Sequence, residues 1–170
     1  MLNEYQQEML RLLIIQAELE SSFWLFEYLT IGINQYQLDI DGIHGFNHWC
    51  SVAANGLECA ENTNAEKSII LLFSFFHDCC RENDGRDPYH GERAAQFIID
   101  NREVLPQLSD IQINKLVIAC EGHNLGEISK DITIGCCWDA DRLDLIRIGI
   151  QPRARFMSSE VGKERAEQRL

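Results

Sequence analysis

The apolar positions of this chain recur at helical spacing along almost its whole length. In residues 2–20 they fall at steps of three and four, as on one face of an amphipathic helix. The positions of that face are Leu2, Tyr5, Met9, Leu12, Leu13, Gln16 and Leu19. Ser21-Ser22 offers an N-cap for a second helix over 23–33, and the Gly, Asn and Asp residues of 32–43 predict a loop.

The most apolar segment lies near the middle of the chain. Residues 65–80 are apolar nearly all round a helix, which indicates a central buried helix, and another helix is predicted over 44–59 before it. Residues 81–88, which follow, are polar and contain Gly and Pro, as loops do. Asp87-Pro88 at the end of this loop offers an N-cap and a first turn for a helix over 90–105.

Three further helices are predicted in the C-terminal part of the chain. They cover 110–121, 136–148 and, as a charged and exposed helix, 158–170. The segment between the first two reads mostly as loop, with a short extended piece at 131–135. The sequence shows neither a strand-rich region nor an internal repeat. The pattern therefore predicts an all-α helical bundle.

Length and charge narrow the class of protein. A chain of 170 residues can form one domain with a proper core, and we expect an N-terminal helical extension, 1–38, packed on a helical domain, 39–170. The net charge of −12 disfavours extended nucleic acid as a partner, because such a surface would repel the phosphate backbone. A small anionic substrate stays compatible, since a metal and a few arginines can invert the local field.

The sequence has no features of export or membrane insertion. Its first ten residues are polar and acidic, unlike a signal peptide, and no run reaches the roughly 18 uncharged apolar residues that a transmembrane helix needs. The seven cysteines form no C-x-x-C motif and are odd in number, which fits reduced thiols acting as small hydrophobes. A cytoplasmic protein is expected.

Candidate chemistry centres on the doublet His77-Asp78, which ends the most apolar run. A buried imidazole beside a buried carboxylate is costly unless something binds both. A divalent metal does so, since it accepts a neutral ring nitrogen and a carboxylate oxygen together. His48 lies upstream in HGFNHW and Asp141 lies downstream in WDADRLDL, so the chain supplies further ligands of the same kinds.

The order His48, His77-Asp78, Asp141 resembles the HD-domain superfamily of metal-dependent phosphohydrolases. The resemblance covers residues 40–150 and includes HGFNHW before the doublet and DADRLD after it. It implies an HD-domain-like helical bundle in which these four side chains bind a divalent ion, for which a mixed N/O set suits Mn, Mg, Fe, Co or Ni. Asp139 is expected either to hydrogen-bond to one of these ligands or to replace Asp141 as a ligand.

Two more histidines, His90 and His123, lie between the doublet and the final aspartate. In HD proteins with two metals, extra histidines occur in this interval. The resemblance thus allows one or two ions per chain. His90 and His123 either complete a second metal site or face the substrate, where one of them could contact a phosphate or protonate a leaving group.

Charged residues close to the doublet are candidates for substrate binding. Arg81 and Arg93 could hold a phosphate, because a guanidinium binds it in bidentate fashion. Asp87, together with Asp78, could position or deprotonate an attacking water. Arg142 follows the metal aspartate directly, and we expect it either behind the ligands, paired with a neighbouring carboxylate, or against the phosphate.

The favoured function is hydrolysis of a small phosphorylated molecule, such as a nucleotide, by a metal-activated water. One departure affects the substrate: many HD proteins carry an arginine three residues after the first histidine, where this chain has Ser51. The alternatives are a di-iron oxygenase of the HD type and a non-catalytic helical module that binds metal or nucleotide. The N-terminal amphipathic helix could also support a homodimer.

Overall fold

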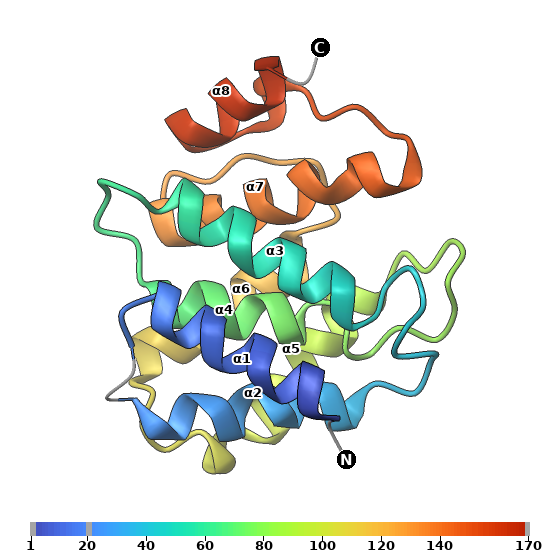
Figure 1. The fold of residues 1–170 in the computed structure, drawn as a ribbon, viewed down its shortest axis with the longest axis vertical. Coiled ribbons are helices and arrows are strands. Elements are labelled where there is room, and N and C mark those ends of the chain that lie inside the picture. The colour runs from blue at the N-terminus through green and yellow to red at the C-terminus, as the bar shows by residue number, and fades with distance from the viewer. Residues whose placement is uncertain (1–2, 20–21, 169–170) are drawn as a thin grey trace.

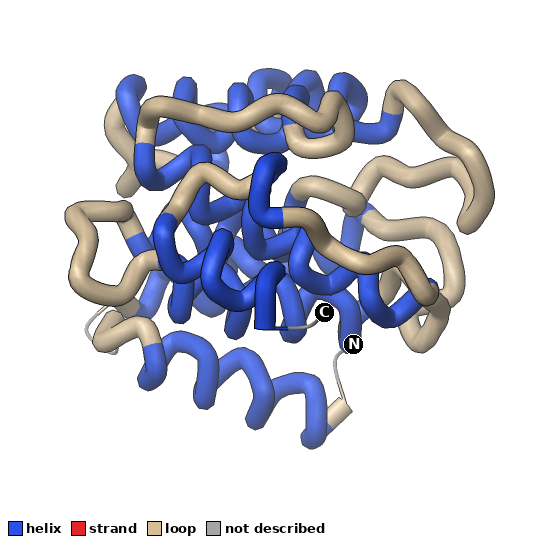
Figure 2. Tube along the Cα trace, turned by 90° about the horizontal axis from the view of Figure 1, so that it is seen from above, coloured by secondary structure: helices blue, strands red, loops and turns tan. Residues whose placement is uncertain are grey.

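The computed structural model describes residues 3–19 and 22–168, and all regular structure in these ranges is helical. The α-helices are α1 (Glu4–Gln16), α2 (Phe23–Gln35), α3 (Phe46–Cys59), α4 (Lys67–Phe76), α5 (His90–Asp100), α6 (Asp110–Gly122), α7 (Ile132–Asp144) and α8 (Glu160–Gln168). Short 3-10 helices are η1 (Arg102–Val104), η2 (Leu145–Ile148) and η3 (Ala154–Phe156). The described residues contain no strand, so the predicted all-α class is confirmed (Figure 2).

Helix α4 lies at the centre of the molecule, and helices α2, α3, α6 and α7 pack around it (Figure 1). Every residue from Ile69 to Phe76 is buried. A helix that is covered on all sides needs an apolar surface all round, as the sequence predicts. The helix ends at Phe76 rather than at residue 80, so His77 and Asp78 come directly after its last helical residue.

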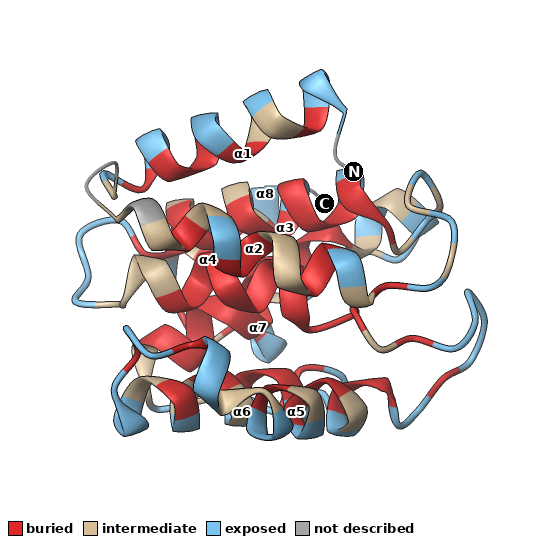
Figure 3. Cartoon of the chain, turned by 90° about the horizontal axis from the view of Figure 1, so that it is seen from below, coloured by how far each residue is buried: buried red, intermediate tan, exposed pale blue. Residues whose placement is uncertain are grey.

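Helices α3 and α7 pack side by side against α4, and buried residues gather in these three helices (Figure 3). Gly56 of α3 permits this close approach. A Cβ at Gly56 would lie 2.5 Å from Cγ2 of Ile70 in α4 and 3.3 Å from Cβ of Ala140 in α7. The three helices that supply most of the predicted ligands are thus held in direct contact by a residue without a side chain.

The N-terminal helices cover one side of this core, with α1 on α3 and α2 on α4. The predicted apolar face of α1 is wrong in part: Tyr5 and Leu12 are 60% and 49% exposed, whereas Leu10 and Ile14 are buried. Tertiary packing selects the face that meets α3, and apolar spacing alone does not determine it. Leu2 and Ser21 lie outside the described residues, and α2 continues to Gln35, beyond the predicted start of a loop.

Two local predictions are wrong, namely the extended piece at 131–135 and the N-cap at Asp87, and in both the hydrogen bonds of an aspartate explain the difference. Residues 131–135 are not extended, since the Asp131 carboxylate accepts from the N–H groups of Thr133 and Ile134 and so begins α7. Asp87 does not cap α5, which begins at His90. The predicted helix over 90–105 also ends early, at Asp100, and continues only as the short helix η1.

The C-terminal helix α8 is charged, as predicted, but it is not free of the core. It packs against α7 and α3, and Gly162 and Ala166 are buried. A Cβ at Gly162 would lie 2.5 Å from Oδ2 of Asp139 in α7. Within the described residues, no helix combines the length and apolar character needed to cross a membrane.

Candidate metal centre

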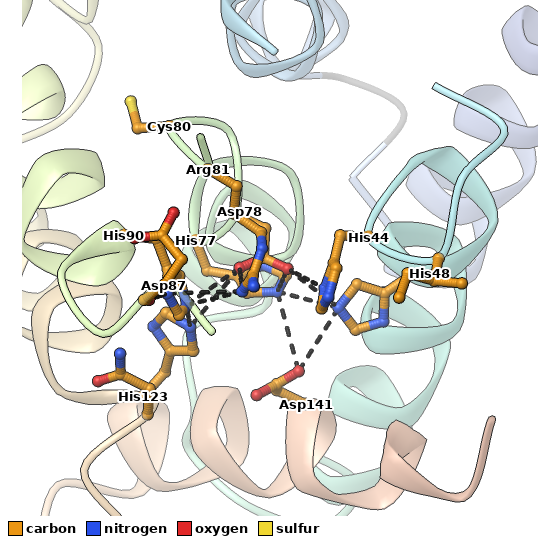
Figure 4. A network of polar contacts seen from close by, with 12 residues as sticks. His44, His48, His77, Asp78, Cys80, Arg81, Asp87, His90, His123 and Asp141 are labelled. Atoms are coloured by element: carbon orange, nitrogen blue, oxygen red, sulfur yellow. Dashed lines mark hydrogen bonds and ion pairs between the residues drawn. The ribbon is translucent and has the colours of Figure 1, made fainter. Parts of the chain in front are cut away.

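Three helices bring the predicted ligands together at the centre of the bundle (Figure 4). His48 comes from α3, Asp141 from α7, and the doublet from the end of α4. The Nε2 atoms of His48 and His77 lie 3.2 Å apart, and Oδ1 of Asp141 lies 3.5 and 3.8 Å from them. Oδ2 of Asp78 lies 3.7 Å from His48 and 3.6 Å from His77. Four donor atoms thus converge on one point.

The other oxygen of Asp78 faces a second pair of histidines. Its Oδ1 lies 3.2 Å from Nε2 of His90 and 3.8 Å from Nε2 of His123, and these two nitrogens are 2.7 Å apart. His90 is the first residue of α5, and His123 directly follows the last residue of α6. Their helices approach closely at Gly91, where a Cβ would lie 2.5 Å from the carbonyl oxygen of Cys120. The carboxylate of Asp78 therefore lies between two histidine pairs.

Each of these four histidines has its Nδ1 atom beside a hydrogen-bond acceptor. The acceptor is Oδ2 of Asp144 at 2.7 Å for His48, and the carbonyl oxygens of Phe73 and Ser74 at 3.2 and 3.1 Å for His77. It is the carbonyl oxygen of Asp87 for His90, and that of Cys120 at 2.6 Å for His123. A neutral ring that donates from Nδ1 has no proton on Nε2. All four Nε2 lone pairs then point into the centre.

This donor set fits a divalent metal ion. With every Nδ1 donating, the Nε2 atoms of each pair, 3.2 and 2.7 Å apart, turn lone pairs toward each other, and a cation between them relieves that repulsion. A proton is a poor candidate for that cation, because burial lowers the pKa of His77 to about 3. Burial also lowers the pKa of His90. Imidazole nitrogens and carboxylate oxygens are ligands that first-row divalent metals accept.

The pKa of His77 predicts how the metal-free protein responds to acid. The unfolded chain binds a proton here below about pH 6.5, whereas the folded protein does so only near pH 3, so folding stability falls as the pH falls between these values. Asp78, Asp141, His123 and His48 surround the ring. From pH 7 to pH 5 we expect the free energy of unfolding to drop with a slope approaching about 1.4 kcal/mol per pH unit from this group.

Urea titrations of the metal-free protein at pH 7, 6 and 5 measure this slope. His77→Asn, which cannot titrate, should show a smaller slope than the wild type. Equal stability at pH 7 and pH 5 would contradict a neutral, buried His77.

Two further residues belong to the centre: His44, which the sequence suggested only as a helix cap or as a residue that orients His48, and Asp144, which was not a predicted site residue. Nδ1 of His44 lies 3.1 Å from Oδ2 of Asp78, and Nη2 of Arg147 lies 3.3 Å from the same nitrogen. Asp144 lies three positions after Asp141, which places both carboxylates on one side of α7. That spacing was the available signal for Asp144, while the signal for His44, which precedes α3, was its place at the start of the motif HGFNHW.

Asp144, and not Asp139, accepts a hydrogen bond from the Nδ1 atom of a histidine of the centre. The buried Asp139 carboxylate accepts from the N–H groups of Ser158 and Ser159 at 2.7 Å each and from the Ser159 hydroxyl at 2.7 Å. It therefore anchors the segment before α8. Asp141 is the aspartate of α7 whose carboxylate faces the Nε2 atoms of His48 and His77.

Removing Asp144 should weaken metal binding without removing a ligand. Its carboxylate orients the His48 ring and increases the basicity of Nε2, and loss of such a partner costs about 10- to 100-fold in metal affinity. We expect that decrease for Asp144→Ala and a smaller one for Asp144→Asn, which keeps an acceptor. Competition with a chromophoric chelator measures it. Asp139→Asn is the matched control and should change thermal stability but leave metal affinity within about twofold of wild type.

The charged candidates near the doublet divide into two groups. Arg81 is buried against the centre, with Nη1 3.5 Å from Oδ1 of Asp78 and Nη2 donating to the Gly85 carbonyl at 2.8 Å. Arg93 lies elsewhere, donating to the Cys80 carbonyl at 3.0 Å and to the Asp87 carboxylate at 2.5 Å. Only Arg81 of these two arginines lines the cavity beside the centre.

Asp87 is bound by other protein groups. Besides the bond from Arg93, its carboxylate accepts from the N–H of Glu82 at 2.9 Å. Burial opposes its ionisation, but these two bonds outweigh burial and lower the pKa of Asp87. Its carbonyl oxygen accepts from His90. The structure thus brings Asp87 to the centre through its backbone, while its side chain binds Arg93.

Arg142 also lies beside the centre, but it pairs with no carboxylate within 4 Å among the described residues. Its Nη1 donates to the Phe156 carbonyl at 2.6 Å, and its guanidinium lies over the Trp138 ring, 5.8 Å from the centroid. It lines the same cavity as Asp78, His90, His123 and Asp141, which has a volume of about 540 Å³. The donor groups are therefore open to a small molecule.

No protein-family model matches the chain, and no curated protein does so either. A solved structure does match: a protein described as a predicted HD superfamily hydrolase, from an uncultured Thermotogales bacterium. The two share 21% identity at a TM-score of 0.67, with 84% of this chain and 83% of that chain covered. The chain has the HD-domain fold. The resemblance inferred from the histidines and aspartates is thereby confirmed for the fold.

In this HD fold the doublet follows the central helix. The described cysteines do not belong to the metal centre. All seven thiols are free, and none belongs to the donor groups of the centre. Burial raises the pKa of Cys120 and Cys137 well above the usual value, which keeps them protonated and poor metal ligands. The centre is accordingly built from nitrogen and oxygen donors.

Proposed function

We propose that the protein is a metal-dependent phosphohydrolase that acts on a small phosphorylated molecule, a class that includes nucleotides. The observation that carries this proposal is the convergence of four histidine Nε2 atoms on the Asp78 carboxylate at one end of an open cavity. His48, His77, Asp78 and Asp141 would hold one divalent ion. Asp78, His90 and His123 would hold a second one.

Such ions lower the pKa of a bound water and polarise a phosphoryl group. The chain's own groups bind and orient the substrate. The buried guanidinium of Arg81, fixed by the Gly85 carbonyl, would donate to a phosphate oxygen and offset its charge. Asp78 would accept a hydrogen bond from the attacking water and so orient it. Arg93 would act indirectly, by holding Asp87 and through it His90.

The test is phosphate release by the purified protein. Chelator-treated protein is reloaded in turn with Mn²⁺, Mg²⁺, Fe²⁺, Co²⁺ or Ni²⁺ and offered nucleotides and simple phosphate esters. We expect at least one metal to support turnover. Absence of phosphate release with every metal and ester would contradict the proposal.

A di-iron oxygenase is the second candidate, because two histidine pairs share one carboxylate here. It predicts two irons per chain and an absorption spectrum that changes with oxygen. Oxygen consumption by the iron-loaded protein, in the absence of phosphate release, would favour the oxygenase.

A further inference from the structure

The cavity beside the metal centre has a wall with different chemistry from its histidine–aspartate end. Six apolar side chains of the segment 145–157 line it: Leu145, Ile148, Ile150, Pro152, Phe156 and Met157. The segment connects α7 to α8 and contains η2 and η3. One cavity thus joins a site for an anionic group to an apolar surface.

We propose that the cavity takes the phosphate ester of an apolar alcohol, with the phosphate at the histidine–aspartate end and the apolar group along the 145–157 segment. The phosphate end of this proposal rests on the proposed function. The apolar end rests on the segment itself, through its exposure, its charge and the way in which the fold holds it.

Apolar side chains at the wall remain in contact with solvent. Ile148, Ile150 and Phe156 are 43%, 50% and 37% exposed. Single exposed apolar residues are common, but three that line one cavity beside a metal centre form a surface that a ligand would cover favourably. Each methylene of a ligand that leaves water against this surface adds to its affinity.

The segment is held in place at both ends. At its start, Arg147 donates from Nε to the Ile43 carbonyl at 3.0 Å and contacts His44 through Nη2. Gly149, with φ of +78°, provides the left-handed residue that ends η2. Beyond its end, Asp139 binds the backbone of Ser158. The wall is therefore formed before a ligand arrives, which limits the ordering cost of binding.

The charge of the segment suits an anion. It carries Arg147, Arg153 and Arg155 and no acidic residue, in a chain whose net charge is −12. Arg147 pairs with the Asp144 carboxylate at 3.4 Å, so the positive charge available to a ligand comes from Arg153 and Arg155. Arg153 lines the cavity, and the Arg155 guanidinium lies 4.7 Å from the centroid of the Phe156 ring. A local cationic region in an acidic protein attracts small anions to this opening.

Among the described residues that line the cavity, few amide and no hydroxyl side chains could recognise a sugar or a nucleobase. Among the described lining residues, amide side chains come only from Asn124 and Gln151. Asn124 already donates to the Pro88 carbonyl at 3.1 Å. Specific recognition of hydroxyls or base edges relies on several placed polar groups, so the wall favours an apolar group over a sugar.

Binding of straight-chain alkylphosphonates, from ethyl to octyl, to the metal-loaded protein tests the wall separately from turnover. We expect the affinity, measured by calorimetry, to rise about three- to fourfold per methylene until the wall is covered. Ile150→Asn should reduce this increment. Ile111→Asn, at a 72% exposed position of α6 away from the cavity, is the matched control and should leave it unchanged.

Turnover of alkyl phosphates and glycerol phosphate completes the test. Higher kcat/KM for hexyl phosphate than for glycerol phosphate would support the proposal. Two results would overturn the proposal and leave the proposed function standing. One is hydrolysis of glycerol phosphate or nucleotides with a kcat/KM equal to or higher than that for hexyl phosphate, and the other is phosphonate binding that does not depend on chain length. Chain-length-dependent binding without any phosphate release would instead contradict the proposed function while supporting the ligand class.

Discussion

Replacing Asp78 by asparagine is expected to abolish tight metal binding and, with it, phosphate release. The carboxylate faces one histidine pair with each oxygen, so the substitution removes the charge that both donor groups share. Loss of the bound metal removes several kcal/mol of transition-state stabilisation, and at about 1.4 kcal/mol per tenfold this corresponds to a decrease in kcat/KM of about 10³-fold or more.

The charge of Asp78 is the reason for this large effect. Burial opposes its ionisation, but the surrounding histidines, His77 first among them, and the hydrogen bond from His44 hold the pKa of Asp78 well below its usual value. The side chain is therefore an anion in the protein interior. Asparagine keeps the shape and one acceptor oxygen but cannot neutralise a divalent ion.

Metal stoichiometry and phosphate release are both measured for this variant. Asp110→Asn, at a 98% exposed side chain of α6, is the control and should match the wild type in both. Circular dichroism establishes that Asp78→Asn is folded. A folded Asp78→Asn protein that binds metal as tightly as the wild type would contradict the assignment of this carboxylate.

Metal binding is also expected to stabilise the fold strongly. The ligands come from helices that are distant in sequence, so the unfolded chain lacks the site and binding favours the folded state. At a free metal concentration 1,000-fold above the dissociation constant, the gain is about 4 kcal/mol. For a chain of this size, that gain raises the melting temperature by about 8–16 °C.

Thermal melts of the wild type with a chelator, and with Mn²⁺, Mg²⁺ or Ni²⁺, measure this shift. Asp78→Asn should show little or none of it. A wild-type melting temperature that stays the same with every metal would contradict a metal centre at the core of the bundle.

Much of the fold could be predicted from the sequence because it is encoded locally. An apolar run, interrupted only by Ser74, specifies α4 as the central helix, and the doublet that ends this run specifies where the polar centre begins. Helix bounds were less well predicted, since Asp131 and Asp87 bind partners that spacing does not reveal. The buried face of α1 was predicted incorrectly for a similar reason, because the packing of the neighbouring helix decides which apolar residues of α1 are covered.

The sequence by itself determined the helical class and the residue types of the centre, because apolar periodicity and a buried His-Asp doublet are local properties. Only the tertiary structure decided which of these residues meet. His48 contacts Asp144, and His90 contacts His123, across long stretches of chain. The Asp139 carboxylate accepts hydrogen bonds from Ser158 and Ser159, and the 145–157 segment lines the cavity. These pairings depend on how the helices of the described residues fill a common volume, and no local pattern specifies that packing.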